Sequence, residues 1–222
     1  MRYYPLFLDI RNRKCLVVGG GSVGTRKTET LVRCGAEVTV ISRVFSKGFS
    51  GIGDDKKNPM LVCKDYEPSD LEGVFLVFAA TSDRDLNERI RLDAEKQGKL
   101  YSIADDPNRS CFIAPSVVAR GDLTIAVSTS GQSPALAKKL RQNLETLYGP
   151  EYADFLRIMG SFRKRILEKG HDPETHKDLF RQVIDRDVPS MIREGRNNDV
   201  RAVFQEVFGK EFDEGFFGDL KD

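Results

Sequence analysis

The chain has 222 residues, of which 40% are hydrophobic and 31% charged, a composition typical of a globular protein with enough apolar residues for a core. The 35 Lys and Arg residues almost balance the 34 Asp and Glu residues, and the net charge of +1 excludes a general attraction to nucleic acid or to an anionic membrane. Apolar runs such as 74–80 are too short to span a bilayer, and residues 1–13 lack the apolar core of a signal peptide. We therefore expect a cytoplasmic protein with no membrane and no nucleic-acid partner.

The cysteines and histidines indicate neither a disulfide nor a metal site. The four cysteines form no C-x-x-C pair and lie beside or inside apolar stretches, so we expect four buried, reduced thiols. These residues are Cys15, Cys34, Cys63 and Cys111. His171 and His176 lack further ligands at helical spacing, and we predict no bound metal.

The first 112 residues alternate apolar strands with helix-like segments. The predicted strands are 15–18, 37–41, 60–63, 74–80 and 100–104, and the predicted helices are 22–34 and 85–97. A connection rich in glycine and charge, which we expect to be mobile, occupies 45–59. Continuous apolar strands separated by helices predict a parallel sheet covered on both faces. Right-handed crossovers then make this sheet doubly wound.

The pattern changes after residue 112. Two strand candidates, 112–118 and 123–129, have only a turn sequence between them, which predicts an antiparallel pair. Ser133 caps a predicted helix with Pro134 at its first position, and helical segments follow to the end of the chain. The predicted α/β organisation is a Rossmann-type doubly wound domain over 1–112, a small α+β dimerisation segment over 113–149 and a helical domain over 150–222.

A glycine loop follows the first strand. Residues 19–24 match the G-x-G-x-x-G pattern between a strand and a helix, which is the context that dinucleotide binding requires. The first glycine permits the tight turn, the second lets the backbone approach a pyrophosphate, and the third lets the helix pack closely on the strand. The helix N-terminus favours phosphate. The predicted cofactor contacts here are Gly19, Gly21, Ser22, Val23 and Gly24; the alternative is a glycine turn that binds nothing.

Two further strand ends complete the predicted nucleotide site. The second strand ends at Ser42, Arg43 and Val44, where a NAD site usually carries an Asp or Glu that accepts from the ribose. Arg43 could reach a 2′-phosphate or lie beside the adenine, so these residues leave NAD and NADP open. At the end of the fourth strand, Ala80 and Thr81 bring small side chains to the edge of the sheet. Asp83 follows them, either at this edge or as the cap of the next helix.

Several strings of residues then occur in a distinctive order. They are YPLFL (4–8), VGGGSVGTRK (18–27), AATSD (79–83) with Asn87, ADDP (104–107), FIAPS (112–116) and GDLTIAVSTSGQSP (121–134). On these residues the chain resembles the precorrin-2 dehydrogenase family, which includes the dehydrogenase module of siroheme synthase. The resemblance covers about residues 3–148, and 149–222 match only in helical character.

The resemblance implies an activity. Precorrin-2, a reduced tetrapyrrole with eight carboxylates, would lose two electrons to NAD as cofactor and become sirohydrochlorin. It also implies a homodimer in which the segment 112–129 crosses to the partner, and a functional aspartate at the position of Asp105. A carboxylate at that strand end can accept a proton or hold a pyrrole N–H. The alternatives are that Asp106 takes this role or that both residues form a solvated turn.

A substrate with many carboxylates requires cations around it, and Arg suits bidentate carboxylate contacts. The candidates for substrate binding are Arg109, Arg120, Lys138 and, in a hydroxyl-rich loop before a helix, Ser128. Lys139 and Arg141 lie in the same region. Two other functions stay open: an enzyme that also inserts Fe²⁺ or Co²⁺ into sirohydrochlorin, and a nucleotide-sensing regulatory module without catalysis.

Overall fold

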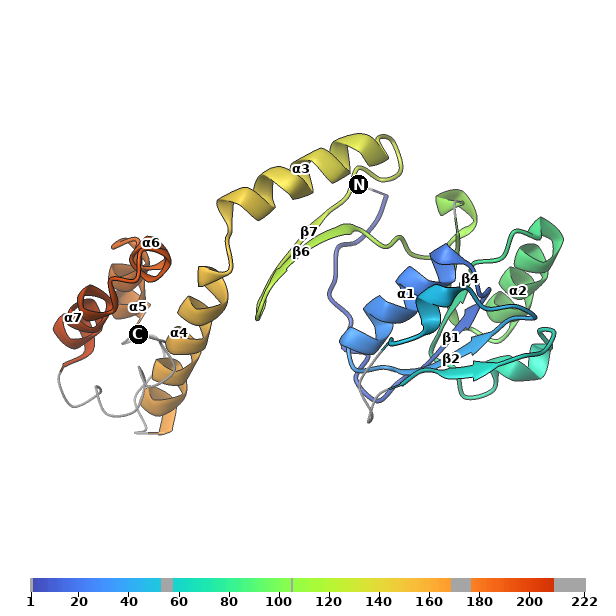
Figure 1. Ribbon diagram of the computed structural model, residues 1–222, viewed down its shortest axis with the longest axis horizontal. Coiled ribbons are helices and arrows are strands. Elements are labelled where there is room, and N and C mark those ends of the chain that lie inside the picture. The colour runs from blue at the N-terminus through green and yellow to red at the C-terminus, as the bar shows by residue number, and fades with distance from the viewer. Residues whose placement is uncertain (1, 53–57, 105, 169–176, 210–222) are drawn as a thin grey trace. The chain divides into compact units, whose positions relative to one another are not determined.

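The computed structural model describes residues 2–52, 58–104, 106–168 and 177–209. The chain divides into two compact units, residues 1–114 and residues 115–222 (Figure 1). The finer division of the second unit, with a boundary near residue 149, stays a prediction.

The first unit is built on a five-stranded sheet. Its strands are β1 (Lys14–Val18), β2 (Glu37–Ile41), β3 (Met60–Val62), β4 (Leu76–Ala79) and β5 (Leu100–Ile103). They pair in the order β3-β2-β1-β4-β5, and every neighbouring pair is parallel. The helices are α1 (Ser22–Arg33) and α2 (Arg84–Lys96), with short 3₁₀ turns η1 (Lys47–Phe49), η2 (Pro68–Leu71) and η3 (Pro107–Arg109). The predicted doubly wound parallel sheet is confirmed.

Each face of the sheet has its own core. Cys15 and Val17 of β1 pack into a cluster with residues of α1, whereas Leu16 and Val18 pack into a cluster with residues of α2. This alternation follows from the pleat of a strand, whose successive side chains point to opposite faces. Because both faces are covered, β1 and β4 are buried at nearly every position, and this burial explains their uninterrupted apolar sequences.

The connection after β2 is partly folded into this unit. Phe49 in η1 is buried in the α1-side core and makes an edge-to-face contact with Phe45, with ring centroids 5.5 Å apart. The expectation of a mobile connection is therefore wrong for this part, because the two aromatic rings are packed. Residues 53–57 of the same connection lie outside the described residues.

The four cysteines are free thiols, but only one of them is buried. Cys15 lies inside β1, while Cys34, Cys63 and Cys111 are exposed, so the expectation of four buried thiols was wrong for three. The physical reason is their position at the ends of elements. Cys34 is the C-cap of α1, Cys63 follows the edge strand β3, and Cys111 follows the η3 turn.

The second unit begins with an antiparallel ribbon. Strands β6 (Ser116–Arg120) and β7 (Leu123–Val127) pair directly, and Gly121 in their two-residue turn has a φ of 56°. This confirms the predicted pair. Helix α3 (Pro134–Leu147) follows, and the Ser133 side chain accepts from the N–H of Leu136 as its cap.

Four helices complete the second unit. They are α4 (Glu151–Glu168), α5 (Lys177–Ile184), α6 (Val188–Arg193) and α7 (Asn197–Phe208). The ring of Phe162 lies at the centre of their core, 4.7 Å from the ring of Phe204 and 5.0 Å from that of Phe208 between centroids. Within the described ranges, no helix is both long enough and apolar enough to cross a membrane.

Candidate dinucleotide-binding site

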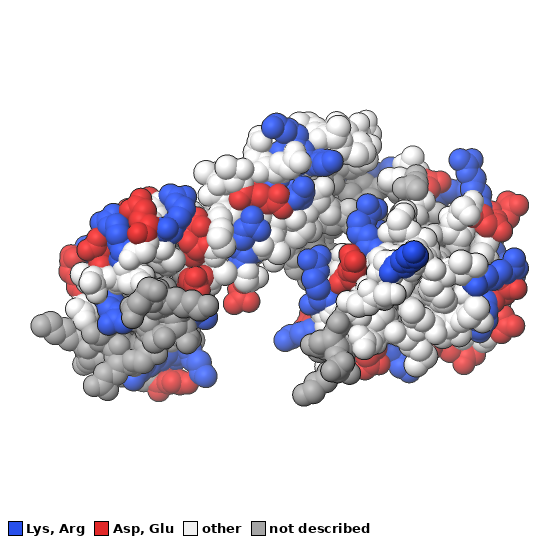
Figure 2. All heavy atoms as spheres, in the orientation of Figure 1, with Lys and Arg blue, Asp and Glu red and all other residues white. Residues whose placement is uncertain are grey.

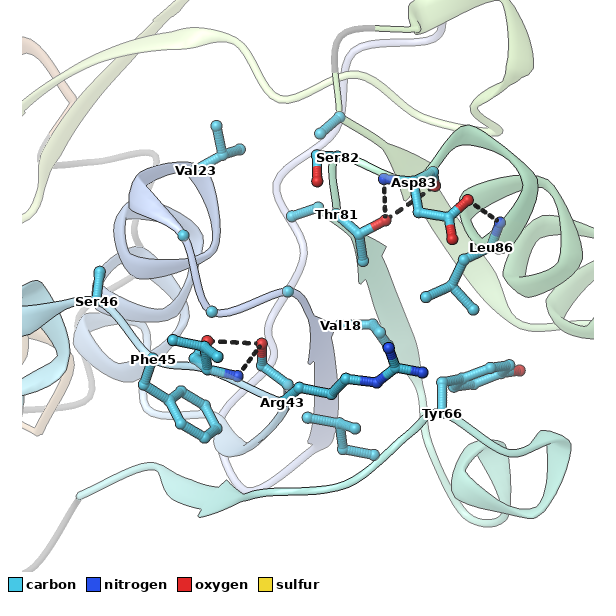
Figure 3. A pocket seen from close by; sticks show the side chains of 18 of the residues that line it. Val18, Val23, Arg43, Phe45, Ser46, Tyr66, Thr81, Ser82, Asp83 and Leu86 are labelled. Atoms are coloured by element: carbon cyan, nitrogen blue, oxygen red, sulfur yellow. Dashed lines mark hydrogen bonds between the residues drawn. The ribbon is translucent and has the colours of Figure 1, made fainter.

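A cavity of about 720 Å³ opens at the carboxyl ends of the parallel strands (Figure 3). The sheet order reverses between β1 and β4, and ligands of doubly wound sheets bind outside the strand ends at such a point. The lining residues come from the ends of all five strands and from the starts of α1 and α2. They are 18–23, 41–46, 64–66, 80–83, Leu86 and Ala104. All the predicted cofactor contacts except Gly24 are among them.

The glycine loop has the geometry that the sequence pattern requires. Gly19 has a φ of 127°, and a Cβ there would collide with the carbonyl oxygen of Ala80. A Cβ on Gly24 would collide with the carbonyl oxygen of Gly19, so α1 approaches the loop closely because residue 24 has no side chain. By contrast, a Cβ on Gly21 would meet nothing within 4 Å. The loop is therefore tightly packed at residues 19, 20 and 24 and open at Gly21, where a ligand would lie.

The first turn of α1 suits a pyrophosphate. Gly21 is the N-cap and no side chain caps the helix, so its first N–H groups are not taken by a capping oxygen. The first turn also holds no acidic residue that would oppose an anion. A hydrogen bond fixes the backbone of Gly21, because the hydroxyl of Thr25 donates to its carbonyl oxygen at 3.0 Å. The site therefore fits the phosphates of a dinucleotide.

An ion pair crosses the other end of the cavity. The Nε of Arg43, after β2, donates to Oδ1 of Asp65, after β3, at 2.5 Å. Figure 3 shows the Arg43 side chain extending from the end of β2 toward Tyr66. The guanidinium lowers the pKa of the Asp65 carboxyl, so Asp65 is ionised at neutral pH. Next to this pair, the Ser42 hydroxyl donates to the carbonyl oxygen of Val44 at 2.8 Å.

The loop after β4 is fastened to α2. The buried amide of Asn87 donates to the carbonyl oxygen of Thr81 at 3.0 Å and accepts from the Thr81 hydroxyl at 2.7 Å and from its N–H at 3.3 Å. Asp83 lines the cavity and also caps α2, because its carboxylate accepts from the N–H groups of Asp85 and Leu86. The cap predicted from the sequence is therefore confirmed, and a contact of Asp83 with a ligand stays a prediction.

The end of β5 carries the predicted catalytic residue. Asp105 lies outside the described residues, but Ala104 directly before it lines the cavity. Asp106 directly after it is the N-cap of η3, and its carboxylate accepts from the N–H of Arg109 at 3.2 Å. Asp106 thus has a local structural role, and the catalytic role of Asp105 stays a prediction.

Sequence analysis missed one wall of the cavity. Lys64, Asp65 and Tyr66 follow β3, and Tyr66 is buried with its hydroxyl donating to Asp93 at 3.2 Å. Burial and the Asp93 carboxylate both raise the pKa of Tyr66, so it stays a neutral donor. The sequence could have predicted this wall. Parallel strands end at the same edge of a sheet, so the residues after the third strand must lie beside those after the second.

The predicted substrate-binding residues are divided between the two units. Arg109, in the first unit, lies 3.4 Å from a carboxylate oxygen of Glu88. The Arg120 guanidinium donates to the carbonyl oxygens of Glu145 and Tyr148 and so caps the end of α3. Ser128 and Lys138 are exposed residues of the second unit. Among the described residues no group of three or more His, Cys, Asp and Glu could hold a metal, and His171 and His176 lie outside them.

A doubly wound parallel sheet with a glycine loop at the reversal of strand order defines a Rossmann-type dinucleotide-binding protein. Residues 6–116 match a protein family described as "Putative NAD(P)-binding", and residues 120–147 match one described as "Sirohaem biosynthesis protein central". The chain therefore belongs to the NAD(P)-binding family that the first match defines.

Individual relatives extend this comparison. A siroheme synthase of Photobacterium profundum is 33% identical over 201 residues, covering 90% of this chain and 43% of that protein. Siroheme synthase 1 of Yersinia enterocolitica is 40% identical over 166 residues, covering 75% of this chain and 35% of that protein. The chain thus spans less than half the length of these curated relatives. A solved structure, "SirC, precorrin-2 dehydrogenase", has a TM-score of 0.75 at 25% identity and covers 92% of this chain and 98% of its own.

Proposed function

We propose that this chain catalyses the NAD-dependent oxidation of precorrin-2 to sirohydrochlorin in siroheme biosynthesis. The observation that carries the proposal is the cavity at the reversal of strand order, lined by the glycine loop and followed along the chain by the Asp105 position. The similarity to a precorrin-2 dehydrogenase structure over nearly the whole chain supports the same substrate.

The reaction removes two electrons and two protons from the tetrapyrrole. NAD⁺, when bound, accepts a hydride, and the second proton leaves to a base or to water. The part of the protein is to place two large molecules against each other. The open backbone at Gly21 and the start of α1 hold the phosphates, and the small residues Ala80 and Thr81 let a flat ring lie against the end of β4.

Asp105 is the residue that we propose to act on the tetrapyrrole. It directly follows Ala104 at the edge of the cavity, where a carboxylate can accept the departing proton or hold a pyrrole N–H. Asp106 is the less suitable neighbour because its carboxylate already caps η3.

For the substrate carboxylates we propose contacts with Lys138 and Ser128 of the second unit and with Arg109 of the first unit. Lys138 and Ser128 are exposed on or just before α3, and the charge of Lys138 matches a carboxylate. Arg120 is the weakest of the four candidates, because its guanidinium is engaged by backbone carbonyls of residues 145 and 148.

We further propose a homodimer and a cytoplasmic location. In the second unit, Val117 of β6 and Leu136, Leu140 and Leu147 of α3 are large apolar side chains left exposed. Such a surface is typical of an interface between subunits. The free thiols fit a reducing compartment. On the face shown in Figure 2, acidic side chains are interspersed among the basic ones, and the whole chain has a net charge of only +1.

The deciding experiment is an anaerobic assay with precorrin-2 and NAD⁺, following NADH and the tetrapyrrole spectrum. NADH formation that depends on both substrates supports the proposal, and the absence of any NAD-dependent spectral change contradicts it. A nucleotide sensor would bind NAD⁺ without turnover. A second arm supplies sirohydrochlorin with Fe²⁺ or Co²⁺, and metal insertion above the uncatalysed rate would add a chelatase activity.

A further inference from the structure

The end of β3 is joined to the end of β2 by contacts other than the ladder. The N–H of Ser42 donates to the carbonyl oxygen of Val62 at 3.2 Å, and the Cys63 thiol donates to the carbonyl oxygen of Arg43 at 3.3 Å. These bonds continue the pairing beyond the last strand residues. They bring Asp65 beside Arg43 although 22 positions separate the two in sequence.

This pair lies beside the strand end that contacts the adenine ribose in dinucleotide-binding sheets. The ribose contact in such sheets comes about 20 residues after the glycine loop, at the end of the second strand. In this chain that position is Ser42–Val44, which contains no carboxylate. Asp65 supplies one from the neighbouring strand, within hydrogen-bond distance of Arg43 and in the same cavity.

The charges of the cavity are balanced. The charged residues among its described lining are two cations, Arg43 and Lys64, and two anions, Asp65 and Asp83. Arg43 pairs with Asp65, and Lys64 pairs with Asp70 at 2.7 Å. A 2′-phosphate would therefore meet a guanidinium that already has its counter-ion, next to a carboxylate that repels it. A ribose diol would instead find an acceptor.

We propose that Asp65 makes this site select NAD over NADP, by holding Arg43 and by presenting its carboxylate to the adenine ribose. This inference rests on the proposed position of the nucleotide in the cavity. Both side chains are largely exposed, at 79% and 67% of their surface, so the pair can adjust to a ligand. Without Asp65, Arg43 becomes a free guanidinium, which is suited to bidentate phosphate binding.

The test measures binding of NAD⁺ and NADP⁺ by calorimetry, without tetrapyrrole, to the full chain and to Asp65→Asn. We expect the wild type to prefer NAD⁺, and we expect Asp65→Asn to shift the ratio of the two dissociation constants toward NADP⁺ by about tenfold or more. The double variant Arg43→Gln/Asp65→Asn should lose that gain, because no guanidinium remains for the phosphate. The matched control is Glu72→Gln, which removes one exposed carboxylate outside the cavity.

Each contrary result overturns the inference. It fails if Asp65→Asn keeps the wild-type ratio, if Glu72→Gln shifts the ratio equally, if the double variant retains the gain, or if the wild type prefers NADP⁺. Circular dichroism establishes that each variant is folded. Because binding is measured without turnover, an enzyme inactive on precorrin-2 would leave this result intact, whereas a wild type that binds neither nucleotide would contradict both proposals.

Discussion

The carbonyl oxygen of Gly19 occupies the space that a side chain on residue 24 would need. The contact joins the turn after β1 to the first turns of α1, so the third glycine of the loop positions the helix and does not touch the cavity. The obstacle to a larger residue is backbone rather than a movable side chain. The loop cannot accept that residue without displacing the N-terminus of α1.

Gly24→Ala should therefore damage both folding and binding. We expect the free energy of unfolding to fall by about 1–3 kcal/mol, as for other overpacked sites. We also expect NAD⁺ affinity to fall, because the N–H groups of α1 move. Denaturant unfolding and calorimetry measure the two effects. If neither the free energy of unfolding nor the NAD⁺ affinity changed, the loop could accommodate a side chain at residue 24 and this prediction would be wrong.

Gly21 is the matched position with the opposite expectation. A Cβ there meets nothing within 4 Å, so Gly21→Ala and Gly21→Asp should keep the wild-type melting temperature within a few degrees. Gly21→Asp should nevertheless abolish NAD⁺ binding, because its carboxylate would oppose the pyrophosphate. Calorimetry that gives the wild-type affinity for Gly21→Asp would remove the phosphate assignment.

Asp105→Ala should separate binding from chemistry. We expect NAD⁺ affinity close to that of the wild type and a turnover number lower by about 100-fold, the usual contribution of one proton-transfer group. Asp106→Asn is the control, since an asparagine can still cap η3 and should keep its turnover. Single-turnover spectra of precorrin-2 oxidation give the rates. A larger loss of turnover in Asp106→Asn than in Asp105→Ala would assign the catalytic role to Asp106.

Raising the pH above 9 should lower the stability of the folded protein because of Cys15. Burial raises the pKa of its thiol to about 11 from an ordinary value of 9.0. The buried neutral thiol of Cys15 contributes fully to the free energy of unfolding below pH 9, where it is protonated in both the folded and the unfolded protein. This contribution is lost as the pH rises toward 11, because the unfolded thiol ionises first. At pH 10 we expect a loss on the order of 1 kcal/mol.

Urea unfolding at pH 8 and pH 10 measures this effect, with Cys15→Ala as the reference for all other groups. The wild type should lose more stability than Cys15→Ala between the two pH values. Equal losses of stability in both proteins would contradict the burial argument.

Thiol modification gives a second measurement. In the native protein at pH 8, a thiol reagent should modify Cys34, Cys63 and Cys111 well before Cys15.

The exposed leucines of α3 should control the oligomeric state. Leu136→Asp and Leu140→Asp each place a charge on the apolar surface proposed as the subunit interface. We expect sedimentation equilibrium to give a dimer for the wild type and a monomer for the double variant. Lys139→Asp, on the same helix, is the control and should stay dimeric. A monomeric wild type would refute the interface.

The first unit was predictable because its physics is local. The strands β1 and β4 are buried on both faces, and such strands have continuous apolar sequences. The glycine loop was equally clear, since Gly19 and Gly24 both lie where a side chain would collide with backbone atoms. Asp65 was not predicted, because its importance depends on a long-range contact with Arg43 that no local pattern carries. The exposure of Cys34 was missed for a related reason: an adjacent apolar stretch does not reveal which side of the helix end a residue occupies.

The amide of Asn87 has a consequence for how a nucleotide enters. Three hydrogen bonds between this one buried side chain and Thr81 already hold Thr81 in place, so the loop after β4 need not become ordered when a ligand arrives. The loop therefore loses its conformational entropy when the protein folds, and the nucleotide binds to a wall that is already rigid. Loosening this amide would slow and weaken binding without removing a single atom from the wall itself.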